Sequence, residues 1–148
     1  SIKYFDGCAP ARPGTWDEVT PLKDAADGVY GRYAAHMEAF DYQGAAADIM
    51  QIVSAANLYI ENSAPWALAK DPDKAGELEL VLWNVLEAIR IANELYAPFM
   101  PAISAEVRRR LGLPAEQDAA LEELCQWGGL AGGAPVEKGD PLFPRLQD

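Results

Sequence analysis

Apolar residues recur at the spacing of an α-helix along most of the chain, and no stretch keeps the alternation of a β-strand. The first periodic stretch follows Thr20 and Pro21, which suit the N-cap and the first turn of a helix. We expect this helix to reach Phe40, although Gly28 and Gly31 each weaken it by about 1 kcal/mol relative to Ala. Its stripe consists of Leu22, Ala26, Val29, Tyr33, Met37 and Phe40.

Two longer helices are predicted in the middle of the chain. Asp41 is the expected N-cap of the first, which should end near Ser63 because Pro65 disfavours helical geometry at the residue before it. Asp71 as N-cap and Pro72 in the first turn begin the second, which ends before residue 98. The two stripes are Ile49, Ile52, Val53, Ala56 and Ile60, then Leu78, Val81, Leu82, Val85, Ile89, Ala92 and Tyr96.

The remaining segments are shorter. Residues 66–70 fit a single turn, a helix from Pro101 ends at Gly112, and a short fifth helix fits 116–126. Residues 1–16 are expected to form an irregular N-terminal loop. Residues 128–148 form a tail that is too irregular for a core element, although the apolar side chains of Leu142 and Phe143 could dock it on the bundle. The sequence therefore predicts an all-α fold, a single domain over 1–148: an antiparallel bundle of about five helices with an irregular C-terminal tail.

Composition is that of a globular protein that folds without covalent help. A chain of 148 residues, half of them hydrophobic, buries enough surface to need neither a disulfide nor a metal. Cys8 and Cys125 are far apart and outside any C-x-x-C pair, so we interpret them as idle thiols. No apolar run approaches the ~20 residues of a membrane span, and no signal peptide precedes the first helix. The chain starts at Ser1 rather than Met, which predicts a segment from inside a longer protein or a processed chain.

Candidate catalytic chemistry is sparse. The single histidine, His36, falls beside the apolar stripe of its helix, which favours a core-edge or surface role, and no zinc set is available around it. The acidic pairs Asp17-Glu18, Glu77/Glu79 and Glu122-Glu123 suit solvated helix faces. The glycine pairs of the tail follow no strand, so they predict no phosphate cradle. With no complete catalytic centre, the chain is expected to bind or support something for a larger protein.

The net charge of −11 argues against a protein that binds nucleic acid independently of sequence, because such a protein carries a basic stripe. A domain that recognises a few unpaired bases through a local patch is still allowed. The only basic run is Arg108-Arg109-Arg110, which suits the C-terminus of a helix, with phosphate contact as the alternative. Trp66, just past Pro65 at a helix end, is either a packing anchor in the core or between domains, or a platform for stacking on a base.

Three segments resemble one family. Asn57 to Lys70 (NLYIENSAPWALAK) resembles the segment in the helical anticodon-binding domain of methionyl-tRNA synthetases that contains Ala-Pro-Trp and Ala-Lys. Leu95 to Pro101 (LYAPFMP) is similar to the end of that family's leucine-rich helix, and Leu142 to Leu146 (LFPRL) to its closing Leu-Phe-Pro-Arg-Ile. Their order and separations agree, and the resemblance covers nearly the whole chain.

The resemblance implies a site for unpaired RNA. Trp66 would stack on the first base of the CAU anticodon, and Pro65 would shape that platform. Asn57, nine residues before Trp66 on the preceding helix, is carried over as the polar neighbour. The family often has an acidic residue three before this asparagine, where this chain has Ser54.

The resemblance also implies parts outside this chain. The family's Asn-x-x-x-Arg pair, which lies on a preceding helix, is absent, as are the nucleotide-binding His-x-Gly-His and Lys-Met-Ser-Lys-Ser motifs. The chain is therefore expected to be most of the anticodon domain of a cytoplasmic, ATP-dependent methionine–tRNA ligase, with no cofactor or metal of its own. Its expected partners are the anticodon loop of tRNA(Met) and the parent's catalytic domain, with no membrane. Without the preceding helix, exposed apolar surface could promote self-association.

Two other interpretations are compatible with the sequence. The same helical domain occurs in other class I synthetases, such as the isoleucyl and valyl enzymes. A helical protein–protein interaction module unrelated to RNA is the other, and it predicts that Trp66 is buried.

Overall fold

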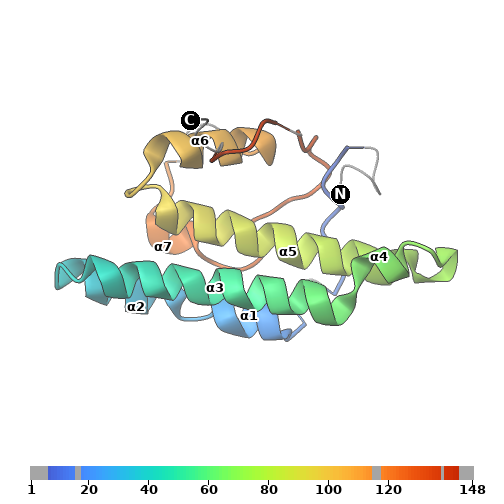
Figure 1. Ribbon diagram of the computed structural model, residues 1–148, viewed down its shortest axis with the longest axis horizontal. Coiled ribbons are helices and arrows are strands. Elements are labelled where there is room, and N and C mark those ends of the chain that lie inside the picture. Colours follow the sequence, from blue (N-terminus) through green and yellow to red (C-terminus); the bar gives the residue numbers. More distant parts are fainter. Residues whose placement is uncertain (1–6, 16–17, 115–117, 138, 144–148) are drawn as a thin grey trace, which may run out of the picture.

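The computed structural model describes residues 7–15, 18–114, 118–137 and 139–143. Within these residues the regular structure is helical, as predicted, apart from one isolated bridge between Cys8 and Pro135. In chain order the elements are α1 (Pro21–Ala26), α2 (Val29–Glu38), α3 (Tyr42–Ser63), α4 (Pro65–Leu68), the 3-10 helix η1 (Pro72–Lys74), α5 (Ala75–Tyr96), α6 (Pro101–Arg110) and α7 (Leu121–Leu124) (Figure 1).

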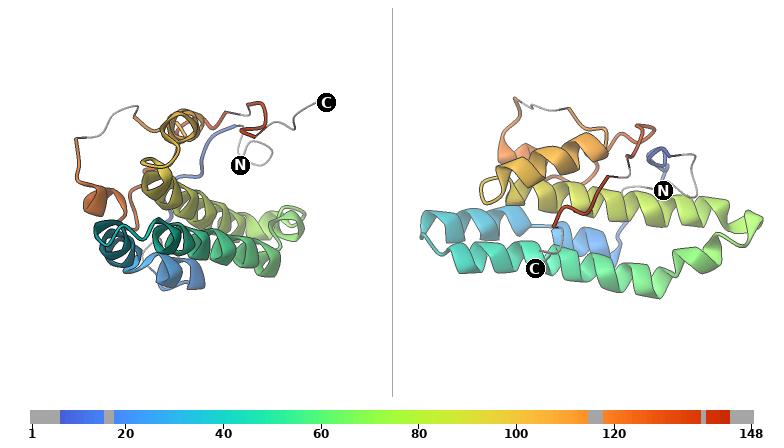
Figure 2. Two further views of the ribbon diagram at one scale, coloured as in Figure 1. Left: turned by 60° about the vertical axis from the view of Figure 1, so that its left-hand side comes forward. Right: turned by 45° about the horizontal axis from the view of Figure 1, so that its top comes forward.

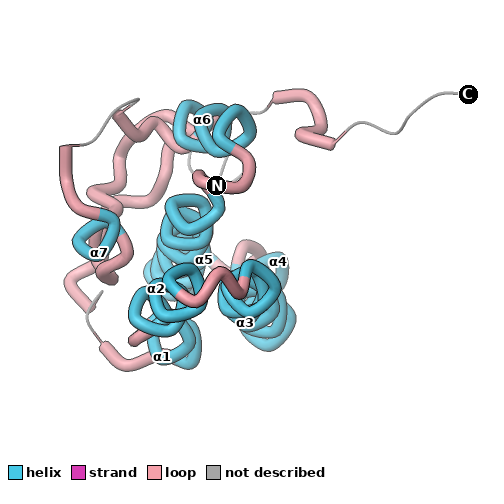
Figure 3. The backbone as a smooth tube through the Cα atoms, turned by 90° about the vertical axis from the view of Figure 1, so that its left-hand side faces the viewer, coloured by secondary structure: helices cyan, strands magenta, loops and turns pink. Residues whose placement is uncertain are grey.

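The two longest helices, α3 and α5, form an antiparallel pair at the centre of the bundle (Figure 1). Helices α1 and α2 pack along α3, and α6 packs on the opposite side of α5, so that α5 lies between two layers (Figures 2 and 3). The one-turn helix α4 and η1 connect α3 to α5 at one end of the bundle. None of the helices in the described ranges has the length and apolarity that a membrane crossing requires.

The helix starts predicted at Thr20 and Asp41 are confirmed by their caps, whereas the start predicted at Asp71 is a 3-10 turn and α5 begins at Ala75. The Thr20 hydroxyl accepts a hydrogen bond from the backbone N–H of Lys23 at 3.1 Å, which satisfies one free donor of α1. Asp41 caps α3 in the same way through the N–H of Gly44, at 2.9 Å. Asp71 caps η1, a single 3-10 turn that leads directly into α5.

Two helix predictions need correction. The single helix expected from Thr20 to Phe40 is divided into α1 and α2, because Gly28 adopts the left-handed conformation at φ 64 and ends the first helical segment. The fifth helix expected over 116–126 is reduced to the four residues of α7, and residues 115–117 lie outside the described part.

The main core lies where α1, α2, α3 and α5 meet, and its fully buried members include Ile49, Ile52 and Leu95. Leu78, Val81 and Leu82 of the predicted stripes pack in a smaller cluster near α4, and two other stripe residues pack in neither cluster. Ile89 is 40% exposed, because its side of α5 borders an open groove rather than another helix. Phe40 is 76% exposed, because it follows the end of α2 in the turn before α3.

The tail contributes to the core, contrary to expectation. Leu130 is buried, and its carbonyl oxygen accepts a hydrogen bond from Nε1 of buried Trp83 at 3.2 Å. The carboxylate of Glu87, which is also fully buried, accepts hydrogen bonds from the N–H groups of Gly128, Gly129 and Leu130 at 2.8, 2.9 and 2.9 Å. Glu87 therefore fixes the start of the tail to the middle of α5.

The tail then pairs with the N-terminal loop. Ala9 donates to the carbonyl of Ala134 at 2.8 Å and accepts from Gly133 at 3.0 Å. Gly132, at φ 78, lies so close to the Pro10 backbone that a Cβ atom there would overlap it, so the position requires glycine. Further on, Leu142 and Phe143 border the groove beside α3 and α5, as their proposed docking role requires.

Candidate nucleic-acid interface

The junction between α3 and α4 is a sharp turn around a proline. Ala64 adopts the left-handed conformation at φ 42, because Pro65 disfavours right-handed helical geometry at the preceding residue. The N–H of Ala64 still donates to Ile60 at 3.0 Å, and the N–H of Ala69 donates to Pro65 at 3.0 Å. Helix α3 thus ends and α4 begins with only Ala64 between them.

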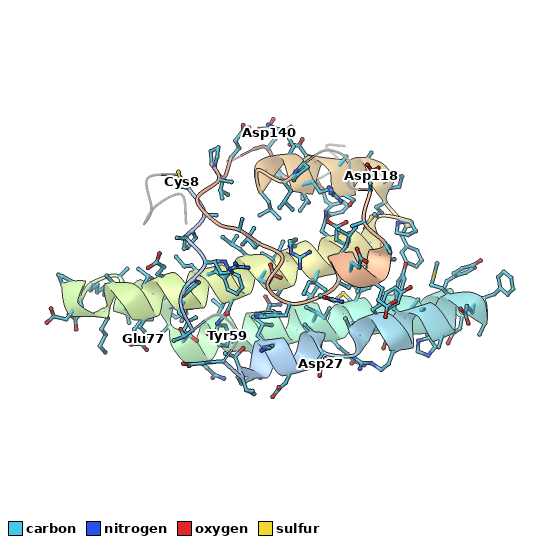
Figure 4. All side chains as sticks on the ribbon, turned by 180° about the vertical axis from the view of Figure 1, so that it is seen from behind. Cys8, Asp27, Tyr59, Glu77, Asp118 and Asp140 are labelled. Carbon is cyan, nitrogen blue, oxygen red and sulfur yellow. The ribbon has the colours of Figure 1, made fainter. Side chains whose placement is uncertain are left out.

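A small apolar cluster holds this turn against α5. Pro65 is buried, and Leu68 packs with buried Leu78 and Val81 of α5. Tyr59, near the end of α3, packs against both this cluster and the main core, and its hydroxyl accepts a hydrogen bond from Nδ2 of Asn84 at 3.0 Å (Figure 4). The backbone of the turn that carries Trp66 is therefore held in place by packing against α5.

Trp66 presents its indole to solvent. The residue is 53% exposed and belongs to neither apolar cluster. The possibility that Trp66 anchors the core is therefore wrong for the described part of the chain. A large flat side chain on a supported turn can stack on another ring with little conformational adjustment.

Asn57 is also exposed, but it does not share a cavity with Trp66. It lies on α3, about 9 Å along the helix axis before the last residue of that helix. It borders a groove of about 560 Å³ between α3, α5 and α6, which Trp66 does not line. The other lining residues are mostly apolar: Met50, Ile52, Val53, Ala56, Ile60, Val85, Ala88, Ile89, Ala92, Asn93, Tyr96, Met100, Ile103, Ser104, Val107, Leu142 and Phe143.

The family model of the anticodon binding domain of methionyl tRNA ligase matches residues 13–148. The chain belongs to this family. The methionyl domain is thus favoured over the isoleucyl and valyl alternatives, and the interpretation as an unrelated interaction module is wrong.

Curated relatives agree with this assignment to the methionyl-tRNA ligase anticodon domains. The chain is 35% identical over 146 residues to the methionine–tRNA ligase of Bacillus subtilis, which covers 98% of this chain and 22% of that protein. It is 37% identical over 146 residues to that of Listeria monocytogenes serovar 1/2a, covering 97% of this chain and 22% of the relative. The chain therefore spans about a fifth of the length of these relatives.

Solved structures show the same domain within a larger enzyme. The apo form of Mycobacterium tuberculosis methionyl-tRNA synthetase superposes with a TM-score of 0.83 at 27% identity, over 99% of this chain and 29% of that one. The same enzyme in complex with methionyl-adenylate gives a TM-score of 0.82 at 25% identity, over 97% of this chain and 28% of that one.

The triple-arginine run of this anticodon domain is largely neutralised within the fold. Arg108 Nη1 bonds Glu94 at 2.7 Å, while Arg109 and Arg110 share the carboxylate of Glu106 at distances of 2.7–3.0 Å. Hydrogen bonds from Arg109 and then Arg110 lower the pKa of Glu106 to about 2. The structural role at the end of α6 is thus observed, and phosphate contact by these arginines stays an untested alternative.

His36 lies at the surface edge, as predicted. Its Nδ1 lies 2.8 Å from Oδ2 of Asp48, whose second oxygen faces Arg32 at 3.5 Å. Across the described ranges no three His, Cys, Asp or Glu side chains are grouped so that they could hold a metal.

Sequence analysis missed the polar residues buried in α5. Glu87 pairs with Arg90 on the same helix, but its other partners are backbone N–H groups of the tail, and Glu94 pairs with Arg108 of α6. Burial raises the pKa of Glu94, with Arg108 and Arg90 acting in the opposite direction. Asn84, which supports Tyr59, was missed for the same reason, because nothing local to its segment marks it.

Proposed function

We propose that this domain binds the anticodon loop of tRNA(Met), with Trp66 stacking on the first base of CAU. The observation that carries the proposal is the half-exposed indole on a turn whose backbone is fixed by Pro65 and Leu68. Unpaired RNA bases are generally recognised by stacking on aromatic side chains and by hydrogen bonds to their edges. A supported, solvent-facing tryptophan provides the stacking surface.

Asn57 and Pro65 have supporting roles in this proposal. Within the described chain the Asn57 carboxamide makes no hydrogen bond, so both its donors and its acceptor are available to a base edge. Pro65 sets the geometry of the turn and orients the indole. Ser54, one turn before Asn57, is exposed and supplies a hydroxyl where the family often has a carboxylate.

The parent protein is proposed to be an ATP-dependent methionine–tRNA ligase. It would form methionyl adenylate and transfer the methionyl group to the 3′ end of the tRNA. The residues for this chemistry and for holding ATP lie outside this chain, so the domain's contribution is selection of the tRNA.

A titration with anticodon stem-loops tests the proposal. One stem-loop carries CAU and a second has its first base changed, and both are added to this chain at low salt while tryptophan fluorescence is recorded. Loss of stacking in Trp66→Ala should weaken CAU binding by about 1–3 kcal/mol, or roughly 5- to 150-fold in Kd. The quench should disappear with Trp66, although Trp16, Trp83 and Trp127 also emit.

Tyr42→Ala is the matched control, because Tyr42 is an aromatic residue with the same 53% exposure at the opposite end of α3. It should leave binding unchanged. Equal binding of both stem-loops would remove the claim of specificity, and unfolding of Trp66→Ala would make the residue a structural anchor. If nothing binds, the titration is repeated with a chain extended upstream, and a second failure rejects RNA binding.

A further inference from the structure

Nearly every cation that the structure describes is engaged within the fold. Arg12 donates to the carbonyl of Gly128 at 3.0 Å, Arg32 pairs with Asp48, and Arg90 is buried against Glu87. Arg108, Arg109 and Arg110 bind carboxylates at the end of α6, and Lys23 also interacts within the fold. These side chains have little charge left for a polyanion.

Lys70 and Lys74 are the exceptions among the described lysines and arginines. Both are exposed, and neither makes a hydrogen bond or an ion pair through its side chain within the described chain. The remaining cations, Lys3, Lys138 and Arg145, lie outside the described residues.

The two lysines lie at the end of the bundle that carries Trp66. Lys70 comes four residues after Trp66, in the turn that directly follows α4. Lys74 comes four residues later, at the end of η1 (Figure 1). Consecutive turn hydrogen bonds hold this connector, including Lys70 N–H to Ala67 at 3.1 Å and Lys74 N–H to Asp71 at 3.1 Å.

Acidic side chains share this end of the bundle without neutralising the lysines. Asp71 is occupied as a cap, because its carboxylate accepts from the N–H of Asp73 at 3.1 Å. Asp73 and Glu77 are exposed and form no ion pair with either lysine. Lys74 also occupies the N-cap of α5, where the helix macrodipole disfavours a cation, so helix stability does not account for its charge.

We propose that Lys70 and Lys74 contact the phosphates that flank the base stacked on Trp66. The inference rests on the proposed function and adds the sugar–phosphate backbone of single-stranded RNA to the site. A chain with a net charge of −11 repels RNA as a whole, so binding requires local cations next to the stacking surface. Phosphate contacts position a nucleic acid without carrying sequence information.

The salt dependence of stem-loop binding tests this inference. Each phosphate contact to a single strand contributes about −0.7 to the slope of log K against log salt, so Lys70→Gln with Lys74→Gln should flatten the slope by about 1.4. Between about 50 and about 200 mM salt, wild-type affinity should fall about 7-fold more than that of the double variant. The preference for CAU over the altered loop should stay the same.

Two controls accompany the double variant. Lys70→Arg with Lys74→Arg keeps both charges and should keep the wild-type slope. Arg32→Gln with Arg109→Gln removes the same number of positive charges, but from side chains that already form ion pairs. It should change the slope by less than half of the change seen for Lys70→Gln with Lys74→Gln.

The possible outcomes separate this inference from the function on which it rests. An unchanged slope in the glutamine variant, together with a Trp66-dependent preference for CAU, overturns the phosphate contacts and leaves stacking intact. An equal loss in the paired-cation control overturns them too, because the effect would then reflect net charge. Absence of any Trp66-dependent binding rejects both proposals.

Discussion

Glu87→Gln isolates the interaction that fixes the tail to α5. The Glu87 carboxylate has no exposed surface and accepts five hydrogen bonds, three from backbone N–H groups and two from Arg90. Glutamine has nearly the same shape, but one of its two polar atoms becomes an NH2 group that faces donors. The substitution therefore removes the negative charge. It also replaces one acceptor oxygen with an NH2 group, which cannot accept the hydrogen bonds of the N–H groups that face it.

The expected loss follows from what is left behind. Arg90 is 4% exposed, and its carboxylate partner lies 2.6 Å from Nη2, so the substitution leaves a buried cation without its counter-charge. Removing one partner of a buried pair costs about 3–5 kcal/mol. Since a domain of this kind is stable by about 5–15 kcal/mol, about a fifth or more of the free energy of unfolding should disappear.

Denaturant unfolding followed by circular dichroism measures this loss. Glu77→Gln, an exposed carboxylate in the first turn of the same helix, is the control and should cost no more than about 1 kcal/mol, the contribution of a negative charge near a helix N-terminus. Hydrogen exchange should also accelerate at the amides of Gly128, Gly129 and Leu130. A loss below about 1 kcal/mol for Glu87→Gln would refute the argument, because it would show that Arg90 finds water or another partner at little cost.

Three further predictions concern other parts of the fold. Hydrogen bonds from Arg109 lower the pKa of Glu106 from 4.5 to about 2, so this carboxylate binds a proton more readily in the unfolded chain. The stability that it contributes is present above pH 4.5 and is lost as the pH falls towards 2. Over this range the thermal midpoint of Glu106→Gln should therefore fall less than that of wild type. Burial raises the pKa of Cys125 to about 12, so mass spectrometry should find an alkylating reagent on Cys8 in the native chain and on both thiols only after denaturation; rapid native labelling of Cys125 would contradict its burial. Phe40 occupies the left-handed position after α2 at φ 57, where glycine is preferred, so Phe40→Gly should raise stability by about 1 kcal/mol in a thermal scan, and a decrease would show that the exposed ring stabilises the turn.

Local signals predicted the helix starts and the turn that carries Trp66. Thr20 and Asp41 act within three residues of themselves, and the effect of Pro65 on Ala64 is confined to one peptide unit. Such features are fully specified by adjacent residues, so they could be predicted without knowing how the helices pack.

The buried polar residues could not be predicted in this way. Glu87 is held by Arg90 on the same helix and also by backbone groups of the tail, so its burial inside an apolar helix cannot be recognised until the tail is positioned. The same limit applies to Ile89, which continues the predicted stripe but faces a groove because no described helix covers that side of α5. The sequence also does not distinguish Lys70 and Lys74 from the other cations. The difference emerges only from packing, which pairs arginines such as Arg108 and Arg109 with carboxylates and leaves these two lysines without such pairs.

The pairing between the N-terminal loop and the tail has a consequence for the order of folding. Contacts within the helical pairs join residues close in sequence, whereas Ala9 and Ala134 come together only after nearly the whole chain has been ordered. Loop-closure entropy makes such distant contacts late to form. Glu87 likewise stays open to water until Gly128, Gly129 and Leu130 dock on it, so its desolvation is also a late step. The helices should therefore fold first, and the contact between the N-terminal loop and the tail should form last. The same contact should be the first part of the folded domain to open by local unfolding.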